Sequence, residues 1–309
     1  MDMRQVYNDA LVELAADNKD ICILEADLMG ASGTKGFKAA YPDRTVNVGV
    51  AEANMVGIAS GLSATGKIPF AATFGCFASR RVYDQFYLSA NYARLNVKLV
   101  GTDPGVTAQF NGGTHMPFED AGLMRNVPQL TIVEPSDEIS LRKLLRVIAE
   151  YPKSVYIRLH RKGGWQYYDE SENFELGKGK LVREGKDITL VSLGLVMLQQ
   201  ALEAADLLAA DGIEAEVIDA LSLKPLDREL IASSLKKTGL AISCENHNIY
   251  NGLGSAVAEV IAEEAIPCRL SRIGSQDEFG QVGLLDGLLE AYGMTAKHIA
   301  DAASKLIGK

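Results

Sequence analysis

A carboxylate at a helix start and two phenylalanines that close the next strand are the residues that most suggest chemistry. Glu52 directly follows the apolar run 45–50 and opens a stretch rich in small residues, while Phe74 and Phe77 end the run 68–74. A carboxylate beside aromatic rings suits a flat, basic heterocycle, because the acid can bond a ring nitrogen while the aromatic ring stacks on its face. Each residue also has an ordinary interpretation, since an acid stabilises a helix start and a phenylalanine packs in a core.

Other polar side chains follow further apolar runs in the same half of the chain. Asp27 follows 21–24, and Asp103 follows 97–101. The next loop carries His115 after two glycines, which allow backbone angles that other residues avoid. A lone loop histidine usually lies at the surface or packs, but ligands of open α/β sheets bind at the carboxyl ends of the strands. We therefore predict that these residues share one site with the carboxylate and the aromatic pair.

Short apolar runs alternate with helical patterns from end to end, which indicates an α/β fold with mostly parallel sheets flanked by helices. Pro69 cannot donate to a ladder, so we expect its strand to pair fully only from Phe70 onward. The expected strands are 21–24, 45–50, 68–74, 97–101, 130–134, 155–159, 188–193, 215–218, 240–243 and 268–273. The expected helices are 6–16, 53–64, 83–93, 137–150, 195–210, 255–264 and 283–292.

A change of composition predicts where the chain divides. At 309 residues the chain is long enough for two domains. The segment 161–173 is polar, aromatic and punctuated by glycine, as expected of a connection between domains. We predict a first domain over residues 1–165, a linker over 166–180 and a second domain over 181–309.

Composition narrows the class of function. A formal net charge of −9 argues against nucleic-acid or anionic-membrane binding, so an anionic substrate would need a local basic cluster. The N-terminus has no apolar signal-peptide core, and no stretch is long enough to span a membrane. The four cysteines have no metal-like spacing, and Cys22, Cys244 and Cys268 fall in or beside apolar runs. We expect these three to be buried free thiols in a cytoplasmic protein.

Six motifs, in their order and spacing, resemble the C-terminal half of a transketolase, the form found as a separate subunit in split transketolases. The resemblance covers essentially the whole chain. The motifs are Glu25-Ala-Asp-Leu28, Val48-Gly-Val-Ala-Glu-Ala-Asn-Met55, Ala72-Thr-Phe-Gly-Cys-Phe77 with Tyr83-Asp-Gln85, Gly112-Gly-Thr-His-Met-Pro117, Pro135-Ser-Asp137 and Arg158-Leu-His-Arg161. It implies a pyrimidine-binding domain followed by a transketolase C-terminal domain, with thiamine diphosphate as the cofactor.

The resemblance assigns the cofactor's pyrimidine to one group of residues. Glu52 would bond N1′ and favour the imino tautomer that removes the C2 proton, which makes it a catalytic residue. Phe74 would stack on the ring with Phe77 beside it. Asp27 and Tyr83 match further cofactor-binding positions of the family.

The resemblance implies that a second group of residues contacts the substrate. His115 matches the family histidine near the reacting carbonyl, as a catalytic and substrate-binding residue. Arg4 and Arg161 match arginines that could bind a sugar phosphate, since guanidinium groups bind phosphate bidentately; the alternative is solvated surface arginines. Asp103 and Asn111 stand where many transketolases have histidine and aspartate. Asp103 is instead typical of deoxyxylulose-phosphate synthases, and Asn111 changes the expected selection of hydroxyaldehydes.

The sequence contains no Gly-Asp-Gly, the motif through which the family binds diphosphate and Mg²⁺, and we expect no metal ligands in this chain. The motif would lie on a separate N-terminal subunit. We expect two copies of each subunit to form an α₂β₂ assembly with a homodimer at its core. The predicted activity is transfer of a two-carbon ketol unit from a ketose phosphate to an aldose. A 1-deoxyxylulose-5-phosphate synthase, a 2-oxo acid dehydrogenase beta subunit and a non-catalytic subunit of the same fold are the alternatives.

Overall fold

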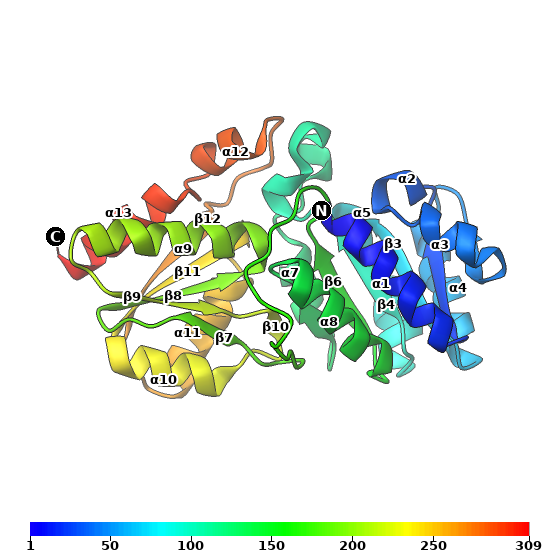
Figure 1. Cartoon of the computed structure of the whole chain (residues 1–309), viewed down its shortest axis with the longest axis horizontal. Helices are drawn as coiled ribbons and strands as arrows, with labels where there is room; N and C mark the ends of the chain where they lie inside the picture. The colour runs from blue at the N-terminus through cyan, green and yellow to red at the C-terminus, as the bar shows by residue number, and fades with distance from the viewer. Residues whose placement is uncertain (309) are drawn as a thin grey trace.

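The computed structural model describes residues 1–308 and shows two α/β halves side by side (Figure 1). The N-terminus lies near the junction of the two halves, and the chain ends at the far side of the second half (Figure 1). The strands are β1 (Ile21–Glu25), β2 (Thr45–Asn47), β3 (Ile68–Phe74), β4 (Lys98–Thr102), β5 (Thr131–Val133), β6 (Val155–Leu159), β7 (Lys180–Arg183), β8 (Ile188–Leu193), β9 (Ala215–Asp219), β10 (Ser222–Lys224), β11 (Leu240–Asn248) and β12 (Arg269–Ser275).

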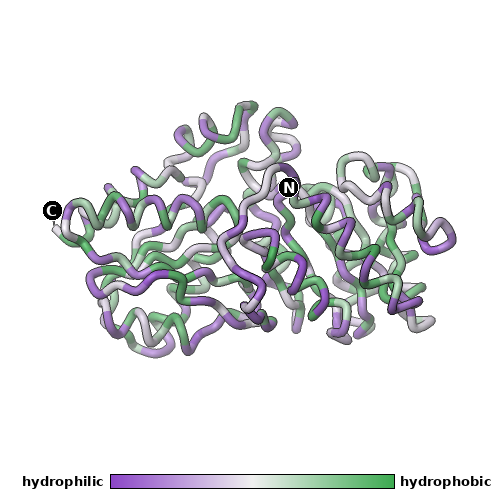
Figure 2. Tube along the Cα trace, in the orientation of Figure 1, coloured by the Kyte–Doolittle hydropathy of each residue, from purple (hydrophilic) through white to green (hydrophobic). Residues whose placement is uncertain are grey.

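Two mostly parallel sheets form the centres of the halves. The first has the order β10-β5-β6-β4-β3-β1-β2 and the second has the order β12-β11-β8-β9-β7. Within residues 1–308, only β10 and β7, at the edges, pair antiparallel with their neighbours. Apolar residues concentrate along the strands and the inner sides of the helices, while the outer turns are hydrophilic (Figure 2). The predicted α/β fold with two mostly parallel sheets is therefore confirmed.

Helices cover both sheets. In the second half α9 and α13 lie on one face, and α10 and α11 lie on the other (Figure 1). The helices are α1 (Met3–Asp17), α2 (Met29–Ser32), α3 (Lys35–Ala40), η1 (Pro42–Arg44), α4 (Glu52–Ala64), α5 (Gly75–Arg80), α6 (Tyr83–Gln85), η2 (Phe86–Tyr92), η3 (Gly105–Asn111), η4 (Gly113–His115), α7 (Asp120–Arg125), α8 (Glu138–Glu150), α9 (Gly194–Ala210), α10 (Arg228–Thr238), α11 (Leu253–Glu263), α12 (Leu285–Ala291) and α13 (Ala296–Ile307).

Several expected elements have different bounds in the structure. Strand β2 ends at Asn47, because Gly49 adopts a left-handed backbone (φ 73°) that leaves the strand. The helix expected over 83–93 is divided into α6 and the π-helical η2, in which Asn91 Nδ2 donates to the Phe86 carbonyl at 2.8 Å. Strand β3 pairs with β1 from its first residue but with β4 only from Phe70. The expected late start of pairing after Pro69 is therefore found on the side of β4 and not on the side of β1.

The two halves share one sheet and a buried polar network. Strand β10 leaves the second half and pairs with β5 of the first. Arg158, on β6, is fully buried and donates to both oxygens of Asp120, at 2.8 and 3.0 Å. It also donates to Glu134 and to the backbone carbonyl of Asn246 on β11. The predicted division at residues 166–180 stays a prediction, although β7 at residue 180 is the first strand of the second sheet in the chain.

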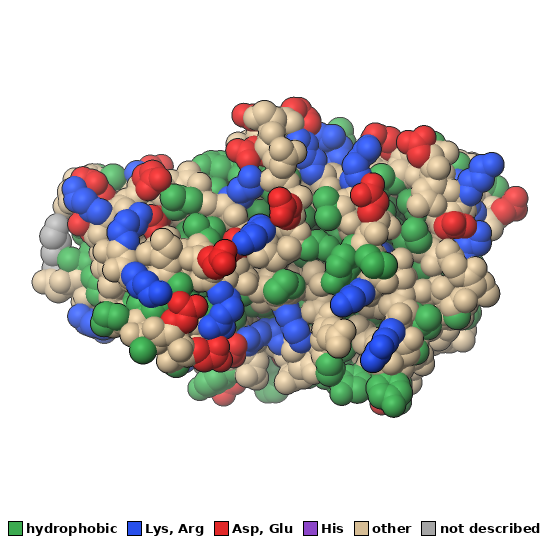
Figure 3. Space-filling view, turned by 90° about the horizontal axis from the view of Figure 1, so that it is seen from below, with side chains coloured by type: hydrophobic (Ala, Val, Ile, Leu, Met, Phe, Trp, Pro, Cys, Tyr) green, Lys and Arg blue, Asp and Glu red, His purple; other side chains and the backbone are tan. Residues whose placement is uncertain are grey.

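The surface is mixed in charge, with basic and acidic side chains interspersed on the face in Figure 3. Within residues 1–308 no helix combines the length and the apolar character needed to cross a membrane. All four cysteines are free thiols. Cys22 and Cys244 are buried as expected, but Cys268 is partly exposed, because it precedes the edge strand β12.

Candidate active site

Glu52 is the first residue of α4 and is buried at the carboxyl end of the first sheet. Glycine and alanine before it let the chain turn from β2 into the helix. One carboxylate oxygen accepts a hydrogen bond from Arg81 Nη1 at 2.9 Å. The carboxylate side chain is 5% exposed whereas the arginine is 50% exposed, so the ion pair joins a buried group to a half-exposed one.

Three rings stand together beside this ion pair. Phe74 ends β3 and Phe77 lies in the first turn of α5, with ring centroids 6.1 Å apart. The His115 ring meets both edge-on, at 5.9 Å from Phe74 and 5.2 Å from Phe77. The Arg81 guanidinium lies over the Phe77 ring at 3.8 Å from its centroid. The predicted acid, aromatic pair and histidine therefore form one connected group.

The loop that carries His115 is stabilised by contacts within the loop and by Asn246 of the second half. Within the loop, Gln109 has a left-handed backbone (φ 47°), and the hydroxyl of Thr114 lies 2.8 Å from His115 Nδ1. At the start of the loop, Asn246 of the second half accepts from the Val106 N–H and donates to the Pro104 carbonyl, both at 2.8 Å. The second half thus fixes the path of a loop that belongs to the first.

Asp103 and Arg161 form a buried, two-point ion pair at the same edge. Arg161 Nε and Nη2 lie 3.1 and 2.7 Å from the two carboxylate oxygens of Asp103. The Arg161 guanidinium is also 5.3 Å from the Phe74 ring centroid, which attaches the pair to the ring group. Burial raises the pKa of Asp103, and the Arg161 charge opposes that rise. The sequence singled out both residues but did not predict that they pair with each other.

Arg4 lies next to this pair at the start of α1. Its backbone N–H donates to the Arg161 carbonyl at 3.0 Å, which brings the two chain segments together. Its guanidinium pairs with Asp2 at 3.1 Å and is about one-third exposed. The two predicted phosphate-binding arginines are neighbours, but each already has an acidic partner.

The remaining predicted residues make their contacts elsewhere. Asp27 has a left-handed backbone (φ 63°) and is linked to Asn47, which accepts from its N–H at 3.0 Å. The Tyr83 ring packs against Tyr87, with centroids 6.1 Å apart. Asn111 is exposed at the end of η3. Their predicted contacts with cofactor and substrate stay predictions.

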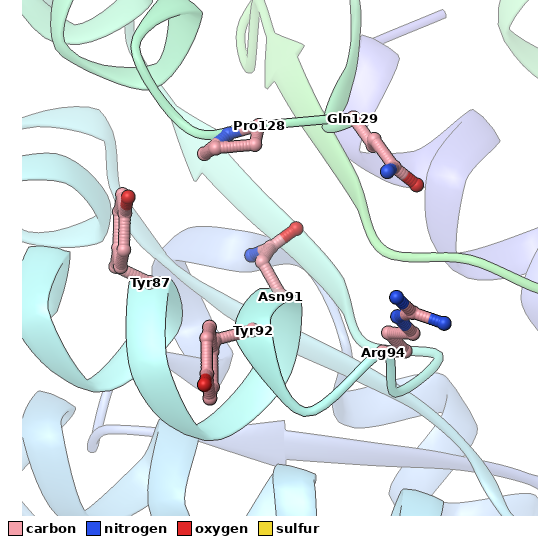
Figure 4. Close-up of a pocket in the computed structure, with 6 residues that line it drawn as sticks. All are labelled: Tyr87, Asn91, Tyr92, Arg94, Pro128 and Gln129. Atoms are coloured by element: carbon pink, nitrogen blue, oxygen red, sulfur yellow. The ribbon is translucent and has the colours of Figure 1, made fainter.

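Two cavities lie near opposite ends of the strands of the first half. One of about 390 Å³ is lined by Tyr87, Asn91, Tyr92, Arg94, Pro128 and Gln129 (Figure 4). Residues 94 and 128–129 precede β4 and β5, so this cavity lies at the amino ends of the strands, opposite the predicted site. Another cavity, of about 530 Å³, lies between the two halves and is lined by Gly113 and Met116 of the histidine loop and by residues 277–280.

Comparison with known proteins identifies the family. Residues 1–164 match the transketolase pyrimidine-binding domain, and residues 177–299 match the transketolase C-terminal domain. This chain belongs to the transketolase family. The resemblance stated from the motifs is thereby confirmed, and the family uses thiamine diphosphate.

Some of the relatives are transketolase subunits that match over nearly their whole length. The chain is 48% identical over 304 residues to the 6-deoxy-6-sulfo-D-fructose transketolase subunit SqwH of Clostridium sp. (strain MSTE9), covering 98% of this chain and 94% of that one. It superposes with a TM-score of 0.92 on a solved split-gene transketolase, described as an inactive beta4 tetramer, with 42% identity and coverage of 99% and 98%. The 1-deoxy-D-xylulose-5-phosphate synthase of Heliobacterium modesticaldum is 35% identical, and the match covers 98% of this chain but only 46% of that enzyme. The chain is therefore a split-transketolase subunit, and the synthase alternative fits less well.

The residues present fit half of a thiamine diphosphate site. Two aromatic rings and a histidine in contact, with a buried carboxylate joined to them through Arg81, match the chemistry of an aminopyrimidine. Among the described residues no group of three or more His, Cys, Asp or Glu side chains is placed to hold a metal ion. Sequence reasoning missed Arg81 and Asn246, because an arginine after a helix and an asparagine within a strand carry no distinctive pattern.

Proposed function

We propose that this chain works with an N-terminal subunit that carries the Gly-Asp-Gly motif, and that thiamine diphosphate binds where the two subunits meet. The pair would transfer a two-carbon ketol unit from a ketose with an anionic end to an aldose. The observation that carries this proposal is the ring group of Phe74, Phe77 and His115, to which Arg81 joins Glu52, at one edge of the sheet. The partner would supply Mg²⁺ and diphosphate binding in an α₂β₂ assembly.

Glu52 and the phenylalanines would act on the cofactor. When bound, thiamine diphosphate supplies a carbon nucleophile for the ketose carbonyl and accepts the electron pair released by cleavage. The Glu52 carboxylate would bond the protonated ring nitrogen N1′, from a position where burial excludes competing water. Phe74 and Phe77 would hold the plane of the ring by stacking and edge contacts.

His115 would act at the substrate. Its Nδ1 faces the hydroxyl of Thr114, which fixes the ring and leaves Nε2 as the nitrogen for a substrate oxygen. A histidine in this position can donate to the developing oxyanion or move a proton at the hydroxyl. The edge-on contacts with Phe74 and Phe77 keep that nitrogen beside the cofactor's place.

The anionic end of the sugar would bind near Arg161 and Arg4. Asp103 partly neutralises the positive charge of Arg161, so a bound anion would share the Arg161 guanidinium with Asp103. Arg4 would supply the more exposed positive charge. One relative is named for a sulfonated ketose, 6-deoxy-6-sulfo-D-fructose, and another for a phosphorylated one, apulose 4-phosphate. We propose that the substrate is a ketose whose far end carries a phosphate or a sulfonate.

Reconstitution tests the proposal directly. We expect the purified chain to have no transketolase activity and to bind thiamine diphosphate weakly, since the diphosphate and Mg²⁺ ligands lie on the partner. Adding the Gly-Asp-Gly-containing chain from the same genome should restore turnover in a screen of ketose phosphates and a 6-sulfo ketose. Full turnover by this chain alone would refute the two-subunit enzyme.

A further inference from the structure

Arg81 contacts two of the groups that the proposed function gives to the pyrimidine of the cofactor, Glu52 and Phe77. Its Nη1 donates to Glu52 Oε1 at 2.9 Å, and its guanidinium carbon lies 3.8 Å above the centroid of the Phe77 ring. A distance of 3.8 Å from an aromatic face is the separation of stacked planar groups. A planar N–H donor therefore fills the space between the carboxylate and the ring.

Local sequence explains why this arginine reaches both groups. Arg81 follows α5 directly and stands four residues after Phe77, so the two side chains lie on the same face of the helical turn. The Glu52 carboxylate comes from another element, α4, and meets the guanidinium above the ring. The guanidinium resembles an aminopyrimidine in being flat and in donating N–H groups to a carboxylate in its own plane.

We propose, on the basis of the proposed function, that Arg81 is a placeholder: its side chain occupies the place of the pyrimidine when no cofactor is bound. It would compete with the pyrimidine for Glu52 and Phe77, and it would move toward solvent when the cofactor binds. The two occupants compete, because both would bond the Glu52 carboxylate and lie against the Phe77 ring. The arginine side chain is half exposed, so its outward path leads to solvent. While it is in place, it keeps the buried carboxylate paired with a positive charge.

The strength of the competition follows from the two contacts. A half-exposed ion pair is worth up to about 1 kcal/mol, and a solvent-exposed cation–π contact is worth about 0.5–1 kcal/mol, so their loss corresponds to about a three- to thirtyfold change in affinity. Arg81→Ala should therefore lower the Kd of the cofactor by this factor. Arg81→Lys, which retains the charge but not the flat stacking group, should give a smaller decrease.

The measurement is calorimetric binding of thiamine diphosphate, with Mg²⁺, to the reconstituted two-subunit complex. Arg146→Ala is the matched control, since Arg146 on α8 is an exposed arginine paired with the exposed Glu13 of α1. It should leave the Kd unchanged. Free guanidinium ion can take the place of the missing Arg81 group. Guanidinium chloride at tens of millimolar should therefore weaken cofactor binding to the Arg81→Ala complex more than to the wild type, whereas sodium chloride at the same concentration should not.

The outcomes separate this proposal from the proposed function. Weaker cofactor binding in both Arg81→Ala and Arg81→Lys would mean that the arginine supports the bound cofactor, which overturns the placeholder but keeps the thiamine site. An unchanged Kd in the alanine variant would also overturn it. Failure of the wild-type complex to bind the cofactor would overturn both proposals together.

Discussion

Replacement of Glu25 by glutamine should remove a pH-dependent loss of stability. Glu25 is the last residue of β1 and is fully buried. Burial raises its pKa from 4.5 to about 7, against the opposing effect of two hydroxyl donors. Thr34 Oγ1 donates to one carboxyl oxygen at 2.7 Å and Ser32 Oγ to the other at 3.2 Å.

The sign and size of the effect follow from that pKa. Between pH 4.5 and about 7 the unfolded chain has released the proton of Glu25 while the folded chain still holds it, so the free energy of unfolding falls as pH rises. The loss is complete above pH 7 and amounts to about 3 kcal/mol, since each pKa unit corresponds to about 1.4 kcal/mol. Glu25→Gln retains the shape and an acceptor for a hydroxyl, but it cannot ionise.

Urea denaturation of both proteins at about pH 5 and pH 8 measures the effect. We expect the variant to be close to wild type at the lower pH and more stable by up to about 3 kcal/mol at the higher pH. Other buried acids titrate in both proteins, so the quantity to compare is the difference in pH dependence. Glu290→Gln, at an exposed position on α12, is the control and should show the wild-type slope. An identical slope for Glu25→Gln and wild type would refute the assignment.

Two further predictions concern the site itself. Glu52→Gln should lower the rate of cofactor C2 proton exchange in the reconstituted complex by about 10²- to 10⁴-fold while the fold, followed by circular dichroism, stays intact; a near-normal exchange rate would contradict its role. Arg161→Ala should raise the KM for phosphorylated or sulfonated ketoses about ten- to a hundredfold, but the KM for uncharged analogues much less. Equal effects on charged and uncharged substrates would mean that Arg161 only holds Asp103 in place.

Most of the fold could be predicted from the sequence because its signals are local. The apolar runs at β1, β3, β6 and β8 have the strand bounds expected within one residue. In α8, the apolar residues are buried because the helical period puts them on one side. These residues are Ile139, Leu141, Leu144, Leu145 and Ile148. The division of the expected helix between Gln85 and Phe86 was not predictable, since α-helical and π-helical turns differ only in their hydrogen-bond partners.

The sequence by itself determined which residue types stand at the strand ends, and hence the chemistry: Glu52 at a helix start, Phe74 at the end of a strand and His115 after two glycines. These follow from position along single elements, which local patterns encode. Only the tertiary structure decided the partners, such as Asp103 with Arg161 and Arg81 with Glu52. Ion-pair choice depends on distances between elements far apart in the chain, and many pairings of the same charges are compatible with one sequence until the packing of the sheets fixes those distances.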